Sequence, residues 1–71
     1  MVYTLTKEEK IDIINQHLKN LEYSKFNSEI SLVEESAAAE PQQILIDEIQ
    51  GQIDSINAKQ AALLSEISSL G

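Results

Sequence analysis

His17 is the residue best suited by type to acid–base chemistry, because an imidazole titrates near neutral pH. On a helix its neighbours lie three and four positions away, and the following ones are Asn20 and Leu21. The carboxylates that could orient the ring, Asp12 and Glu22, each lie five positions away. We therefore predict a solvated helix histidine rather than a general base.

Carboxylates are the second group that could do chemistry, and they occur in adjacent pairs: Glu8-Glu9, Glu34-Glu35 and Asp47-Glu48. Adjacent side chains on a helix diverge by about 100°, so these pairs do not form facing catalytic dyads. Asp47 and Asp54 could hold a stray divalent cation, but no loop alternates ligands around them. The sequence has no cysteine and two glycines, which excludes thiolate metal sites and glycine-rich phosphate loops. We predict that the protein is not an enzyme and has no cofactor and no metal site.

The charge balance excludes further classes of function. Five lysines, no arginine and twelve acids give a net charge of −7, opposite to the sign that binds nucleic acid or an anionic membrane. The longest aliphatic run is Ile44–Ile46, far too short to span a bilayer, and no signal peptide is visible. We expect a cytoplasmic protein. Mimicry of nucleic acid is disfavoured because lysines interrupt the acidic residues, namely Lys10, Lys19 and Lys25.

Two long helices are the elements that must position these residues. Thr6 followed by Glu9 has the spacing of a capping box, and the next proline is Pro41. Proline disfavours helical angles before it and fits the first position of a new helix. We predict a helix over about 6–38, a turn at about 38–40 and a helix over about 41–70. The fold class is therefore all-α, a single antiparallel two-helix hairpin of the coiled-coil type, associating into a helical bundle.

The second helix carries a heptad pattern. Its apolar positions follow 3-4 spacing over more than three heptads, as in a coiled coil, and one face of an ordinary globular helix is the alternative. Isoleucine at both core positions disfavours a parallel dimer. Leu45 and Leu64 widen the face, and Gln60 adds a polar layer that fixes register. The residues in the pattern are Ile46, Ile49, Ile53, Ile56, Gln60, Leu63, Ile67 and Leu70.

The first helix contains two apolar stripes that point about 120° apart. The first is Ile11, Ile14, Leu18 and Leu21, and the second is Tyr23, Phe26, Ile30, Val33 and Ala37. Folding the hairpin at the predicted turn pairs the second stripe with the second helix: Val33 with Ile46, Ile30 with Ile49, Phe26 with Ile53, and Tyr23 with Ile56. Either the first helix then bends near Asn20–Ser24, or its N-terminal half faces another subunit. We favour the second alternative.

A chain of 71 residues gains little from its own core and usually needs reinforcement, for which oligomerisation is the remaining means. We predict a homo-oligomer, with a dimer of hairpins forming an antiparallel four-helix bundle favoured. One hairpin would leave the far side of its second helix open to water. The predicted oligomer or partner interface is Ile11, Ile14, Leu18, Leu21, Ile53, Ile56, Gln60, Leu63, Leu64, Ile67 and Leu70.

The stretch from Lys10 to Ala39, with HLKNLEYSKFNSEISL as its distinctive segment, resembles small uncharacterised helical proteins of tailed phages that infect marine cyanobacteria. The resemblance implies a viral accessory or structural protein made in the host cytoplasm, and it assigns no catalytic or binding residue. The alternative function is that of an acidic regulatory binder that docks on a host protein.

Overall fold

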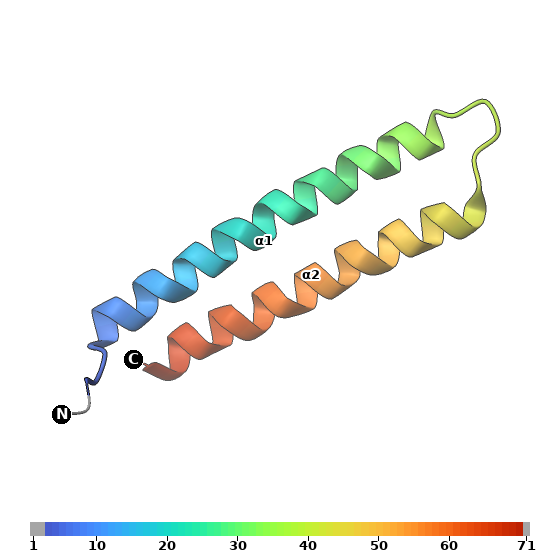
Figure 1. Cartoon of the computed structure of the whole chain (residues 1–71). Coiled ribbons are helices and arrows are strands. Elements are labelled where there is room, and N and C mark those ends of the chain that lie inside the picture. Colours follow the sequence, from blue (N-terminus) through green and yellow to red (C-terminus); the bar gives the residue numbers. More distant parts are fainter. Residues whose placement is uncertain (1–2, 71) are drawn as a thin grey trace.

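The computed structural model describes residues 3–70 and contains two helices, α1 (Lys7–Ser36) and α2 (Gln43–Leu70). They run antiparallel and side by side, so that both ends of the described chain lie at the same end of the molecule (Figure 1). No strand occurs within residues 3–70. The predicted all-α two-helix hairpin is confirmed.

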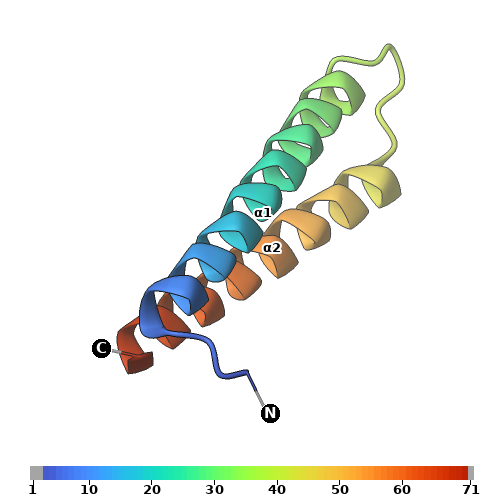
Figure 2. The same cartoon turned by 60° about the vertical axis from the view of Figure 1, so that its left-hand side comes forward.

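The hairpin is a rod rather than a compact body. Its extents are 59 × 19 × 16 Å and its radius of gyration is 16.8 Å, against about 11 Å for a compact domain of this length. A second view shows the helices more widely separated near the connection than near the chain ends (Figure 2). A single pair of helices therefore supplies all the burial that the described chain achieves.

The predicted capping box at the start of α1 is present. The Thr6 hydroxyl accepts from the Glu9 amide at 3.2 Å, and the Glu9 carboxylate accepts from the Thr6 amide at 3.0 Å. Tyr3 donates its hydroxyl to the same carboxylate at 3.0 Å. These bonds satisfy donors that the first helical turn leaves without an intrahelical partner, and they fix where α1 begins.

The connection between the helices is longer than predicted, and α2 begins at Gln43 rather than at Pro41. The Gln42 carbonyl accepts the first bond of the new helix, from the Ile46 amide at 3.1 Å. The Gln42 amide donates to the Glu35 carboxylate at 3.0 Å. Because this bond ties Gln42 back to the last turn of α1, Pro41 and Gln42 belong to the connection instead of the helix.

The heptad of α2 faces α1, as predicted. Ile53 is the buried member, with 7% of its surface exposed, and every other heptad position is half-buried. We call the contact between the helices the seam. Its half-buried members on α2 are Ile46, Ile49, Ile56, Gln60, Leu63, Ile67 and Leu70.

The part of α1 that faces the seam differs from the prediction. The first stripe is half-buried, and 3-4 spacing continues from it along the same face of the helix. Toward the connection that face is mostly polar, with Lys25, Ser28 and Glu35 around a single Leu32. The expectation that the first stripe points away from α2 is therefore wrong. One straight helix cannot turn both stripes toward the same partner, and here the N-terminal stripe faces it.

The second stripe lies outside the seam. Its large members, Tyr23, Phe26, Ile30 and Val33, are 43–64% exposed, so the four predicted pairs with α2 do not form a core. The alternative of a bend is not observed either, since α1 continues as one helix through residues 20–24. We call these four residues the outer stripe.

Candidate interaction surfaces

The side chains considered for catalysis are dispersed over the rod. His17 is exposed, and within residues 3–70 no hydrogen bond joins its ring to another residue. The same part of the chain holds no group of three or more His, Asp or Glu residues that could bind a metal ion.

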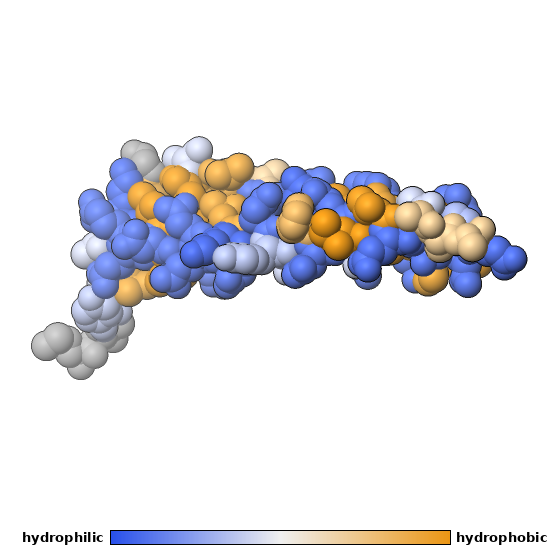
Figure 3. Space-filling model, turned by 90° about the horizontal axis from the view of Figure 1, so that it is seen from above, coloured by the Kyte–Doolittle hydropathy of each residue, from blue (hydrophilic) through white to orange (hydrophobic). Residues whose placement is uncertain are grey.

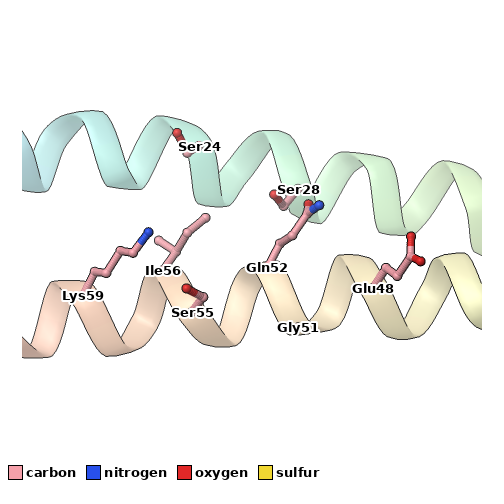
Figure 4. Close-up of a pocket in the computed structure, with 8 residues that line it drawn as sticks. All are labelled: Ser24, Ser28, Glu48, Gly51, Gln52, Ser55, Ile56 and Lys59. Carbon is pink, nitrogen blue, oxygen red and sulfur yellow. The ribbon is translucent and has the colours of Figure 1, made fainter.

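An open groove of about 530 Å³ lies between the two helices. Small residues of both helices are among those that line it, Ser24 and Ser28 from α1 and Gly51 and Ser55 from α2 (Figure 4). Lys59 and Glu48 lie at opposite ends of the groove (Figure 4), about 16 Å apart along the helix. Ligand sites usually enclose their ligand, whereas this groove is open and most of the residues that line it are polar.

Most residues of the predicted interface are used within the hairpin itself. Ile53 is buried and offers no surface to another chain, which corrects the expectation that its far side is open. Gln60 donates to the Glu22 carboxylate on α1 at 2.9 Å, so the polar layer is satisfied across the seam. Leu64 is exposed. Partly open edges remain on the half-buried members, Ile11, Ile14, Leu18, Leu21, Ile56, Leu63, Ile67 and Leu70.

The outer stripe is a surface whose position was predicted incorrectly from the sequence, since it was expected to face α2. A hollow of about 260 Å³ lies beside it, lined by Glu22, Tyr23 and Phe26. Seen from the α1 side, apolar surface gathers in two groups, one near the chain ends and one in the half near the connection (Figure 3). The 3-4-3 spacing of the outer stripe is present in the sequence, but this spacing alone does not say which of the two stripes of α1 faces α2.

A second apolar hollow, of about 280 Å³, lies at the end of the rod where the chain begins and ends. We call it the end hollow. Exposed Leu5 and Ile13 line it together with the half-buried Ile14 and Leu70, and its charged members are one lysine and one glutamate. These two residues are Lys10 on α1 and Glu66 on α2.

The charges divide unequally along the rod. The Gln60–Glu22 bond marks its middle, so residues 22–60 form a turn half and residues 3–21 with 61–70 form an open half. The turn half carries eight carboxylates and two lysines, whereas the open half carries four carboxylates and three lysines. The net charge is thus −6 in the turn half and −1 in the open half. This division of charge follows from the sequence once the chain is arranged as a hairpin.

Neither helix is both long enough and apolar enough to cross a membrane, as judged over the described residues. Comparisons with protein-family models, with curated proteins and with solved structures found no match.

Proposed function

We propose that the protein is a non-enzymatic structural or interaction protein whose helical hairpins associate with one another, two chains forming a four-helix assembly. The observation that carries the proposal is the small core: Ile53 is the single buried apolar residue among those described. Burying a large aliphatic side chain stabilises the fold by roughly 1.5–3 kcal/mol. The other apolar residues of the seam are half-buried within one chain, so they contribute only part of this free energy. A second chain would complete the burial of those at the end of the rod where α1 begins and α2 ends.

The exposed area of the chain supports association of this kind. A single chain exposes 5447 Å², whereas a compact monomer of 7.9 kDa exposes roughly 4,400 Å². The difference is roughly 1,000 Å², similar to the roughly 800 Å² that each partner buries in a standard protein interface. One interface of ordinary size would therefore give each chain the burial expected of a folded domain.

The end hollow is the surface that we assign to this contact. It combines apolar side chains with Lys10 and Glu66, so two copies related by a twofold axis can bring the lysine of each toward the glutamate of the other. Its half of the rod is nearly neutral, and like-charge repulsion is weak there. The resemblance of Lys10–Ala39 to phage proteins makes a viral accessory or structural role part of the same proposal.

The test is the absolute mass in solution, measured by light scattering over a concentration series. We expect a dimer or a higher multiple for the unaltered chain. The double variant Leu5→Asp, Ile13→Asp changes two exposed residues of the end hollow, and we expect it to be monomeric because its acids face their counterparts across the contact. Circular dichroism would check that its helices remain.

A matched control uses the other end of the rod. Ile44→Asp changes an exposed isoleucine in the turn half, and we expect its mass to equal that of the unaltered chain. A helical monomer at all concentrations for the unaltered chain would overturn the proposal. The acidic regulatory binder would then be the next hypothesis to test.

A further inference from the structure

The outer stripe exposes more apolar surface than the hairpin needs to. Tyr23, Phe26 and Val33 are 64%, 60% and 63% exposed, respectively, and Ile30 is 43% exposed. Meanwhile Lys25, Ser28 and Glu35 occupy half-buried positions on the face of α1 that continues the first stripe. Large apolar residues outside and polar residues inside reverse the pattern that stabilises an isolated hairpin. Contiguous exposed apolar surface with polar residues around it is typical of a binding surface.

Three glutamates of α1 flank the stripe. On α1, Glu22 and Glu29 lie along one edge and Glu34 along the other, at positions adjacent to the stripe on the helical surface. The stripe lies within the turn half, whose net charge is −6. A second copy applied to this surface would place two such halves within a Debye length, about 8 Å at physiological salt, and they would repel. A partner with basic residues would be attracted.

The hollow beside the stripe shows how a basic side chain would be held. It is lined by Glu22, Tyr23 and Phe26. An aliphatic stem ending in a positive charge can lie on aromatic rings while its charge meets a carboxylate. Glu22 accepts from Gln60 through Oε2, which leaves Oε1 for a second donor.

We propose that the outer stripe of α1 binds a basic amphipathic helix of another protein. Anchors at 3-4 spacing on that helix pack on Tyr23, Phe26, Ile30 and Val33, and its lysines or arginines face Glu22, Glu29 and Glu34. The stripe spans eleven residues from Tyr23 to Val33, a rise of about 15 Å, so the helix needs about three turns. This surface is separate from the end hollow, and the inference does not depend on self-association.

The probe is a capped peptide of about 14 residues, four helical turns, made of leucines at 3-4 spacing, lysines elsewhere and one tryptophan on the apolar face. The protein has no tryptophan, so the peptide fluorescence reports binding without background. A matched peptide carries glutamate in place of every lysine. We expect the basic peptide to bind, with affinity that falls as NaCl is added, and the acidic peptide not to bind.

Two variants locate the site. Phe26→Ser with Ile30→Ser should weaken binding of the basic peptide by about tenfold or more, because a few central anchors carry most of the affinity of such contacts. Ile44→Ser is the control, since Ile44 is an isoleucine of α2 that is 74% exposed and lies outside both the outer stripe and the end hollow. We expect Ile44→Ser to leave peptide affinity unchanged and amide shifts caused by the peptide to cluster within residues 22–34.

Three results would overturn the inference. One is equal binding of the acidic peptide, which would indicate unselective apolar adhesion. Another is equal weakening by Ile44→Ser and by the stripe variant. The third is a fall in solution mass in the stripe variant, which would assign the stripe to a second copy of the chain. Circular dichroism of each variant separates these results from loss of the fold.

Discussion

At the scale of single residues, Gly51 is the residue least suited to the helix in which it lies, α2. Glycine in a helix interior destabilises by about 0.5–1 kcal/mol relative to alanine. A Cβ atom built at Gly51 meets nothing within 4 Å, so nothing within the described hairpin requires a glycine there.

Gly51→Ala should therefore raise the free energy of unfolding by about 0.5–1 kcal/mol, measured by urea denaturation at fixed protein concentration. Ala58→Gly, one heptad further along the same exposed face of α2, should lower it by a similar amount. An unchanged or less stable Gly51→Ala would mean that another chain approaches the backbone in the groove between the helices.

Glu9 is the residue whose protonation is coupled to local structure. The Thr6 amide, which donates to its carboxylate, lowers the pKa of Glu9 below the ordinary value of 4.5, and the Tyr3 hydroxyl lowers it further. Because the pKa is lower in the folded chain, the capping bonds contribute fully above pH 4.5 and are lost as the pH falls through the folded value.

We expect the amides of the first turn of α1 to lose protection from hydrogen exchange in acid, following the titration of Glu9 measured by carbon-13 NMR. In Glu9→Gln the first turn should open to the same degree at every pH, because no charge is gained or lost. A Glu9 carboxyl that titrates at 4.5 or above would contradict the bonding seen at this cap.

At the scale of elements, the pairing of α1 with α2 has one side-chain hydrogen bond between helices among the described residues, from Gln60 to Glu22. A polar residue in a coiled-coil core lowers stability and disfavours other registers, because a shifted register would leave it without a partner. Both residues are near the middle of the rod, where a slip would displace the isoleucines of α2 from α1.

Gln60→Leu should raise the melting temperature, since a leucine completes the apolar seam and Glu22 remains solvated at its edge. It should also broaden or multiply the NMR signals of α1 as other registers become populated. The control is Gln43→Leu, which changes an exposed glutamine of the first turn of α2. Sharp, single signals in Gln60→Leu would show that the apolar seam alone specifies the register.

The two helices also show why part of the arrangement could be predicted from sequence and part could not. The capping box and the α2 heptad are patterns within a single helix, and both have the predicted geometry. α1 has two apolar stripes, and choosing between them requires the summed contacts along the whole rod. Its seam was hidden by Lys25, Ser28 and Glu35, which are polar at positions that a heptad reading expects to be apolar.

The beginning of α2 was placed too early for a related reason. Pro41 is compatible with the first turn of a helix, so local preference favoured a start there. The bond from the Gln42 amide to Glu35 links two segments across the connection, and no local pattern contains it. The outer stripe and the acidic turn half were both present in the sequence, but their coincidence on one end of a rod appears only after folding.

At the scale of the whole molecule, the uneven charge makes the two proposed contacts respond differently to salt. Association through the open half brings together surfaces that are nearly neutral, so the dimer constant should vary by no more than about threefold between low and high NaCl. Sedimentation equilibrium over a salt series would measure it. A steep increase in association with salt would instead show that the acidic turn halves are in contact.

The short connection from Ala37 to Gln42 has a consequence for how weak the contact between α1 and α2 can be. A short flexible link holds its two ends at an effective concentration in the millimolar range. Helices that bind each other with only millimolar affinity can therefore stay paired within one chain, although the same two helices supplied as separate peptides would drift apart at micromolar concentrations. Protease cleavage within the exposed alanines of the connection would remove this advantage. The two helices would then belong to separate chains, and the fraction that stays paired would fall as the protein is diluted.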